Sequence, residues 1–306
     1  MYSYRDKKLF LQSFHPLTMM AYALVLVYLA LASNHPVLLL SLYVVLLVHI
    51  LLVDAWAAYK TFALFLLFMT VLIILINPLF SRSGSTVLFS LPAVPVLGQI
   101  PVSLEAILYG VDMSLRLLVV MTVFFLYNQS VNPDRAFVLL ARLAPGSAML
   151  VTLATRLIPY LAVRFREIKE VQQTRGVDFD RPGLKHKISS YYPLLKVLLL
   201  NSLENSLNLA EAIQSRGYGS GPRSYYSGVR VQLRDVLVLV SSLAALALGV
   251  AMLTLGWGRY EFYPELSPLY TGPQQVCVFA CLVLATALPA LLNWGWKSWP
   301  YLRWKL

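Results

Sequence analysis

Charged residues are scarce in this chain. They make up 13% of its 306 residues, whereas hydrophobic residues make up 58% and the mean hydropathy is +0.68. A typical soluble domain carries about 25% charged residues, so this composition excludes an ordinary water-soluble fold. The sequence therefore indicates an integral membrane protein.

Residues that carry catalysis or bind metals are also few. The two cysteines, Cys277 and Cys281, lie four apart in an apolar run without histidine or carboxylate neighbours, which is a poor metal site. The four histidines are scattered, so we expect no metal and no cofactor. The chain lacks HExxH, which excludes a zincin-type protease site, and it lacks GxxxxGK[ST], which excludes a P-loop. The chain therefore shows no catalytic or nucleotide-binding motif of its own.

Six apolar stretches are long enough to cross a bilayer, which takes about 17–25 residues. They cover residues 17–33, 37–53, 61–80, 104–127, 233–256 and 276–294. Asn34-His35-Pro36 predicts a tight turn between the first two, which then form a helical hairpin.

Residues 81–102 contain glycine and three prolines and predict an extracytoplasmic loop. The acidic, aromatic stretch 257–275 predicts a second outward loop.

The basic residues set the orientation. Residues 128–232 hold fourteen Lys and Arg against seven Asp and Glu, within a net charge of +11. Both ends of the chain are basic as well, through Arg5, Lys7, Lys8, Lys297, Arg303 and Lys305. Basic segments flanking membrane spans mark the cytoplasmic side. Four spans precede the basic middle and two follow it, and an even number of spans returns the chain to the same side. The N-terminus, the basic middle and the C-terminus are therefore all expected in the cytoplasm. In this setting the basic region suits lipid headgroups or acidic proteins better than nucleic acid.

The basic middle predicts two or three long helices. Asn132-Pro133-Asp134 is a helix start signal, and the helix it opens covers 135–143. Two further helices are expected over 147–175 and 188–216. Residues 147–165 are apolar enough for a seventh span, but Arg156, Pro159 and a polar continuation favour a helix lying along the inner membrane surface.

The expected fold is therefore all-α and polytopic, with about six transmembrane helices and two or three long cytoplasmic coupling helices. It divides into an N-terminal four-span region (1–128), a cytoplasmic or interfacial helical region (129–230) and C-terminal spans (231–306).

Two similar tripeptides close the long helices of the middle region: Thr174-Arg175-Gly176 and Ser215-Arg216-Gly217. Arginine in the last turn complements the negative helix end, and glycine next to it permits the left-handed conformation that ends a helix. One such tripeptide is typical of ordinary capping. Two copies, each with a small residue that permits close approach, predict a binding role. A guanidinium fork matches carboxylates, so we expect each helix end to enter an acidic groove on a soluble partner.

Asp112 and Arg116 form a candidate intramembrane pair. They lie four residues apart in the fourth span, which places them on one helix face. Charge inside a membrane is a candidate for function, but a pair of opposite charges also holds helices together. We favour the structural role.

The chain resembles a known family in several places. The stretches RLIPYLAVRFREIKEVQQTRGVDF (156–179) and NSLNLAEAIQSRGYG (205–219) are similar to those around the two Ala-Arg-Gly motifs of the transmembrane T component of energy-coupling factor (ECF) transporters, the EcfT/CbiQ family. Thr174 and Ser215 replace the alanines. Further similar segments are His15-Pro16-Leu17, Ile76-Asn77-Pro78-Leu79-Phe80 and the run from Leu104-Glu105-Ala106 through Gly110 to Leu115-Arg116.

The resemblance, which covers most of residues 10–230, implies partners and site residues. Arg175 and Arg216 would each dock into one of two cytoplasmic ABC ATPases, with Gly176 and Gly217 setting their presentation. A membrane-embedded substrate-binding S component would rest on the apolar faces of the coupling helices. The complex would import a vitamin, cobalt or nickel across a prokaryotic cell membrane, and this chain would not itself be an enzyme.

Two other classes remain as alternatives. An intramembrane enzyme such as a protease needs a nucleophile and base or a set of metal ligands within the spans, and the sequence shows neither. A stand-alone secondary transporter would show repeated halves with broken helices. The internal similarity of this chain lies outside the spans. The transported substrate cannot be read from the sequence.

Overall fold

The computed structural model describes residues 10–81, 84–94, 98–133, 136, 145–179, 183–221, 231–264, 266–270 and 272–298. The chain divides into two units: residues 1–136 with 229–306 form the first unit, and residues 137–228 form the second. The helix expected over 135–143 lies outside the described residues except for Ala136. The same holds for the basic residues at the N-terminus and for Arg303 and Lys305.

In the described residues of the first unit there are six apolar helices, a short 3-10 helix, η1 (Phe10–Ser13), and two strands. The six helices are α1 (Pro16–Ala32), α2 (Pro36–Leu52), α3 (Trp56–Phe80), α4 (Leu104–Ser130), α8 (Leu233–Thr254) and α9 (Pro273–Ser298). Each coincides with one expected span. Proline opens α1 and α2 at the first helical position, where its missing N–H costs no hydrogen bond.

The helices of the first unit have the composition of membrane spans. Within the part of the chain that the structure describes, α3, α4, α8 and α9 are long and apolar enough to cross a membrane. The other two, α1 and α2, are apolar but only 17 residues long each. The all-α membrane class expected from the sequence is confirmed.

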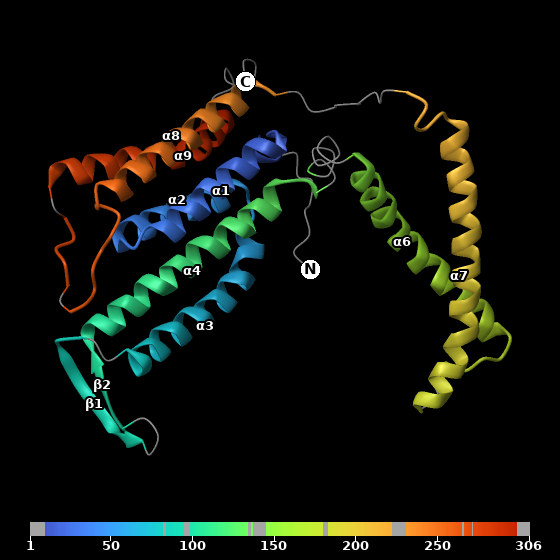
Figure 1. The fold of residues 1–306 in the computed structure, drawn as a ribbon, viewed down its shortest axis with the longest axis horizontal. Coiled ribbons are helices and arrows are strands. Elements are labelled where there is room, and N and C mark those ends of the chain that lie inside the picture. Colours follow the sequence, from blue (N-terminus) through green and yellow to red (C-terminus); the bar gives the residue numbers. More distant parts are fainter. Residues whose placement is uncertain are drawn as a thin grey trace. The chain divides into compact units, whose positions relative to one another are not determined.

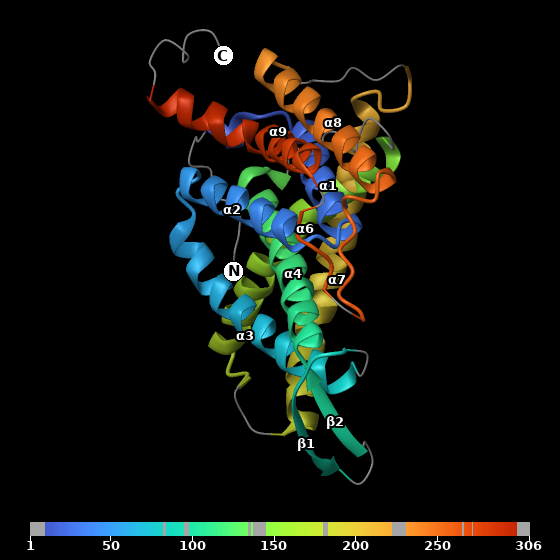
Figure 2. The ribbon, with the colours of Figure 1, turned by 90° about the vertical axis from the view of Figure 1, so that its left-hand side faces the viewer.

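The packing of the first unit places α4 against α1, α2 and α3, while α8 contacts α1 and α9 (Figures 1 and 2). Two glycines permit close helix approach, as small residues do in membranes. A Cβ at Gly110 of α4 would lie 3.3 Å from the Cα of Ile74 in α3. A Cβ at Gly249 of α8 would overlap the side chain of Leu29 in α1.

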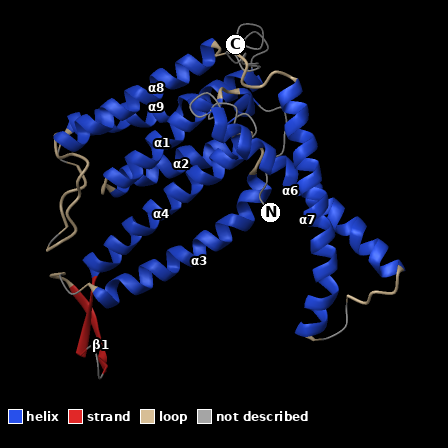
Figure 3. Cartoon of the chain, turned by 45° about the vertical axis from the view of Figure 1, so that its right-hand side comes forward, coloured by secondary structure: helices blue, strands red, loops and turns tan. Residues whose placement is uncertain are grey.

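Residues 87–94 and 98–103 form a pair of antiparallel strands where the sequence predicted a loop. Strand β1 (Val87–Val94) pairs antiparallel with β2 (Gly98–Ser103), with two register irregularities along the ladder. These strands stand out in Figure 3 against an otherwise helical fold. The prediction of a loop, made from the glycine and the prolines, was wrong about the secondary structure, while its extracytoplasmic placement stays a prediction. A two-stranded ribbon has two open edges, at which proline needs no ladder hydrogen bond.

The second unit contains two long helices, α6 (Pro145–Thr174) and α7 (Leu184–Ser215). Both run through an internal proline, Pro159 in α6 and Pro193 in α7. Neither is among the described helices with the length and composition of a span. The placement of 147–165 along the membrane surface stays a prediction.

α6 and α7 cross and then diverge toward the start of α6 and the end of α7 (Figures 1 and 3). Near the crossing, the ring of Phe165 in α6 stacks on that of Tyr191 in α7, and Leu194 is fully buried. The end of α6 lies beyond this crossing, whereas the end of α7 is the tip of a diverging arm (Figure 1).

Candidate functional site

Both tripeptides lie at helix ends, as the sequence predicted. Thr174 is the last residue of α6 and Ser215 the last of α7, so an arginine follows each helix directly. The glycines come next, with φ angles of +87° at Gly176 and +74° at Gly217. This left-handed conformation is open to glycine and costly for other residues.

The two ends share one backbone hydrogen-bond pattern. After α6, Val177 N–H donates to the carbonyl of Gln172 (3.1 Å) and Gly176 N–H to that of Gln173 (3.0 Å). After α7, Tyr218 N–H donates to the carbonyl of Ile213 (3.3 Å) and Gly217 N–H to that of Gln214 (2.9 Å). Each pair is a Schellman motif, which satisfies the last helix carbonyls and fixes the direction of the chain. The similarity of the tripeptides therefore extends to backbone structure.

The small residue before each arginine also behaves alike at both ends. Thr174 Oγ1 donates to the carbonyl of Val171 at 2.8 Å, and Ser215 Oγ donates to that of Ala212 at 3.1 Å. Each hydroxyl proton is thus used within its own helix. The hydroxyl oxygens keep their capacity to accept a hydrogen bond from a partner.

Both arginine side chains are exposed. Within the described residues, neither the Arg175 nor the Arg216 guanidinium forms a hydrogen bond or ion pair. Each therefore presents five N–H donors to a partner from a helix end with a defined backbone. This arrangement suits bidentate binding of a carboxylate.

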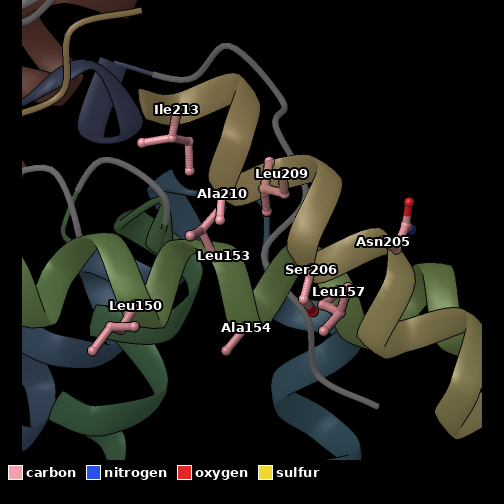
Figure 4. A pocket seen from close by; sticks show the side chains of 9 residues that line it. All are labelled: Leu150, Leu153, Ala154, Leu157, Asn205, Ser206, Leu209, Ala210 and Ile213. Carbon is pink, nitrogen blue, oxygen red and sulfur yellow. The ribbon is translucent and has the colours of Figure 1, made fainter. Parts of the chain in front are cut away.

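An apolar groove opens between the diverging parts of α6 and α7, with a volume of about 460 Å³. Leu153 of α6 lies near Ala210 of α7, and Leu157 lies near Ser206 (Figure 4). The other residues that line it are Leu150, Ala154, Asn205, Leu209 and Ile213. Small residues in such a groove permit another helix to approach closely. The sequence signal for this groove was the three- and four-residue spacing of apolar and small residues on both helices.

A continuous apolar stripe also runs along α7. It consists of large side chains, each at least 48% exposed, at a spacing of three or four residues: Ile188, Tyr192, Leu195, Leu199, Leu203 and Leu207. Such spacing gathers the side chains on one helix face. An exposed apolar face of this length marks a contact with lipid or protein.

The Asp112 and Arg116 side chains are in contact. Arg116 Nη2 lies 3.3 Å from Asp112 Oδ2 and donates to Asn34 Oδ1 at 2.7 Å and to the Ser33 carbonyl at 3.2 Å. Arg116 thus ties α4 to the turn between α1 and α2, and Asp112 is fully buried. The contacts favour a structural role, because they join elements of the first unit.

Comparison with known proteins gives consistent matches. The family model described as CbiQ, cobalt transport protein, matches residues 7–226. Proteins named energy-coupling factor transporter transmembrane protein EcfT are similar to parts of the chain. The Acidaminococcus fermentans protein is 29% identical over 173 residues, the Lactococcus lactis subsp. cremoris protein 36% over 94, and the Staphylococcus aureus protein 28% over 151. The match covers 52% of this chain and 62% of the A. fermentans protein, 30% and 35% for the L. lactis protein, and 46% and 56% for the S. aureus protein. The chain therefore spans less than two thirds of the length of each of these relatives.

Proposed function

Because the chain belongs to the CbiQ family of cobalt transport proteins, we propose that it is the transmembrane coupling subunit of an ECF-type ABC importer. In this role it transmits the ATP-driven motion of two cytoplasmic ATPase subunits to a membrane-embedded substrate-binding S component. The imported substrate is a vitamin or a transition-metal ion.

The observation that carries this proposal is the pair of equivalent arginine ends. Two exposed guanidinium groups with the same Schellman backbone offer the same binding geometry twice. A dimer of ATPases, identical or related, has two equivalent acidic grooves to receive them. We therefore assign Thr174-Arg175-Gly176 to one ATPase and Ser215-Arg216-Gly217 to the other.

The lengths of α6 and α7 suit them for transmitting motion. A helix of 30 residues is about 45 Å long and one of 32 residues about 48 Å. When ATP draws the ATPases together, the arginine ends move with them, and the crossed helices change their angle. The groove and the apolar stripe of α7 then carry this change to the S component, which rests on them.

The remaining parts of the chain fit this division of labour. Its sequence holds no GxxxxGK[ST], so ATP hydrolysis belongs to the ATPases, and this subunit is not an enzyme. The regions 1–128 and 231–306 anchor it in the prokaryotic cell membrane, and the region 129–230 meets the partners. The positive-inside rule places both termini and this middle region in the cytoplasm.

Charge reversal of the two arginines tests the proposal. Membranes containing the Arg175→Glu, Arg216→Glu double variant should yield the subunit without ATPases, because each acidic groove then meets a like charge. The matched control is Arg166→Glu with Lys196→Glu, which reverses two other exposed charges on α6 and α7 and should keep the ATPases bound. Retention of the ATPases by the first double variant would overturn the assignment of both arginines.

A further inference from the structure

The first unit is joined to the second by two connections of the chain. The chain leaves the first unit after Ala136 and returns to it at Val229. The membrane helix before the first connection is α4, which ends at Ser130, and the one after the second is α8, which begins at Leu233. Any force transmitted along the chain reaches the first unit through these two helix ends, which we call the exit ends.

The exit end of α4 is bound by the segment that precedes α1. Gln12, in η1, donates from Nε2 to the carbonyl oxygen of Gln129 at 3.1 Å. Gln129 lies in the last turn of α4, where the carbonyl groups of a helix have no partner within the helix itself. Gln12 is 6% exposed, so the bond is shielded from water. The next residues of the chain remain in the core, since Val131 belongs to the same buried apolar cluster as Phe14.

The exit end of α8 is bound by the same segment. Arg234 Nη2 donates to the carbonyl oxygen of Ser13 at 3.3 Å, and the guanidinium carbon lies 5.7 Å from the centroid of the Phe14 ring. The backbone N–H of His15 donates to the buried carboxylate of Asp235 at 2.7 Å. Four consecutive residues therefore contact both exit ends. We name them the junction segment (Gln12–His15).

The junction segment leads directly into α1. His15 is the N-cap of this helix, and its Nδ1 accepts a hydrogen bond from Leu17 N–H at 3.3 Å. Pro16 follows at the first helical position, where its fixed φ stiffens the connection. α1 packs against both α4 and α8. The junction segment thus extends these contacts to the terminal turns of α4 and α8, which would otherwise fray as helix ends do.

We propose that the junction segment holds the exit ends of α4 and α8 at a fixed spacing, so that both connections to the second unit attach to one rigid base. Gln12 and Arg234 are the positioning residues of this arrangement. Without their bonds the exit ends move independently, and part of the displacement that the ATPases impose on α6 and α7 is taken up by that movement. The inference rests on the proposed function for the source of the displacement, whereas the fixed spacing is a property of the first unit alone.

The fixed spacing is tested on the subunit without partners. In full-length protein with Cys277→Ser and Cys281→Ser, nitroxide labels are attached at Asn128→Cys in the last turn of α4 and at Leu233→Cys at the start of α8. Both positions are exposed. Dipolar electron paramagnetic resonance in nanodiscs measures the distribution of distances between the labels, which should be narrow.

Two variants separate this role from general stability. Gln12→Ala with Arg234→Met removes two side-chain bonds of the junction segment and should about double the width of the distribution, because unsupported helix ends open locally. Tyr22→Phe is the matched control. It removes the hydroxyl that donates to the Thr286 carbonyl at 2.7 Å, a buried bond between the middles of α1 and α9, and should lower the melting temperature without widening the distribution. A width unchanged by the first variant, or increased equally by the control, would overturn the inference.

A milder variant guards against loss of folding. Gln12→Met keeps most of the side-chain volume and removes only the bond to the α4 carbonyl. If the double variant lowers the helix content measured by circular dichroism, this single change should still widen the distribution between labels at 128 and 233. A folded Gln12→Met protein with the original width would contradict the role assigned to Gln12.

The consequence for coupling is tested with purified ATPases bound to the labelled subunit. ATP with vanadate, a transition-state analogue of phosphoryl transfer, arrests the ATPases and should leave the distance between the labels unchanged. In the Gln12→Ala, Arg234→Met variant the same addition should shift the mean distance. A shift with the intact junction segment, or none in the variant, would refute the rigid base. Failure of the ATPases to bind would instead refute the proposed function, while the widths measured on the subunit alone still decide whether the spacing is fixed.

Discussion

The carboxylate of Asp235 accepts a hydrogen bond from the backbone N–H of His15 at 2.7 Å. This bond joins the start of α8 to the start of α1, although the two residues are 220 positions apart in the sequence. His15 is the N-cap of α1, and Asp235 lies in the first turn of α8. The other carboxylate oxygen accepts from Gln232 N–H at 2.8 Å and completes a capping box. One negative charge therefore serves two positive helix ends.

Removing this carboxylate should destabilise the first unit. Asp235 is 1% exposed, so Asp235→Ala leaves two N–H donors without their acceptor, at a cost of about 1–3 kcal/mol each in the free energy of unfolding. Asp235→Asn keeps one acceptor oxygen and should lose less. Thermal unfolding in detergent, followed by circular dichroism, measures both. A melting temperature unchanged by Asp235→Ala would contradict the double role.

The glycines after the arginines should be sensitive to any side chain. Gly176→Ala and Gly217→Ala place a Cβ at positive φ, which costs about 1 kcal/mol, and each should weaken binding of its ATPase about fivefold. Gly221→Ala is the matched control, since a Cβ there meets nothing within 4 Å and no left-handed backbone is involved. Binding of purified ATPases to each variant in nanodiscs decides between the outcomes. Equal effects at 176, 217 and 221 would speak against the Schellman geometry as the reason for these glycines.

Breaking the Asp112–Arg116 pair on one side should cost more than replacing both partners. Arg116→Ala leaves the buried Asp112 carboxylate without its counter-ion, which typically costs about 3–5 kcal/mol. The double variant Asp112→Leu, Arg116→Met removes both charges and should be closer to the wild type. The yield and melting temperature of the purified protein measure the difference. A double variant less stable than Arg116→Ala would show that the charges themselves are needed.

His35 should make the protein sensitive to acid. It lies in the turn between α1 and α2, is 1% exposed, and donates from Nε2 to the Leu269 carbonyl at 3.0 Å. Burial among Tyr260 and Phe279 lowers the pKa of His35, an effect partly opposed by the hydrogen bond to Leu269. The folded protein therefore takes up a proton at this site less readily than the unfolded chain does.

Stability should accordingly fall as the pH drops below about 6.5, the ordinary pKa of histidine, because protons then favour the unfolded chain. His35→Gln keeps a donor for the Leu269 carbonyl and does not titrate, so this variant should lose less stability between about pH 7.5 and pH 5.5. His186→Gln serves as control for a histidine in the second unit and should retain the wild-type loss. The pH dependence of the melting temperature measures all three proteins.

The membrane helices were predictable because their signals are local. Pro16 and Pro36 mark two helix starts, and apolar runs bounded by turn residues place the rest within a few residues of their observed limits. The strand pair formed by residues 87–94 and 98–103 was not predictable in this way. Its strands depend on pairing with each other, and the prolines that argue against a strand are tolerated at open edges.

The helix ends at the two arginines were also predictable, because helix capping depends on neighbouring residues and a glycine after the last turn is the usual signal for a helix end. The packing of the chain that follows the first of them was not. Phe179 and Tyr191 lie 12 residues apart in the sequence and meet only because α7 turns back across α6. The same holds for His35, which reads as an isolated turn residue and is covered by the segment around Leu269. Contacts between distant segments depend on the tertiary fold, so no periodic pattern in the sequence predicts them.

The apolar helices of the first unit differ in length relative to the thickness of a bilayer. α1 and α2, with 17 residues each, reach about 26 Å, whereas α4, with 27, reaches about 40 Å, against a hydrocarbon thickness of about 30 Å. A bilayer thins locally beside a short span and a long span tilts, each at a cost of a fraction of a kcal/mol per ångström of mismatch. We therefore expect the stability of this subunit in a membrane to depend on the acyl-chain length of the surrounding lipids.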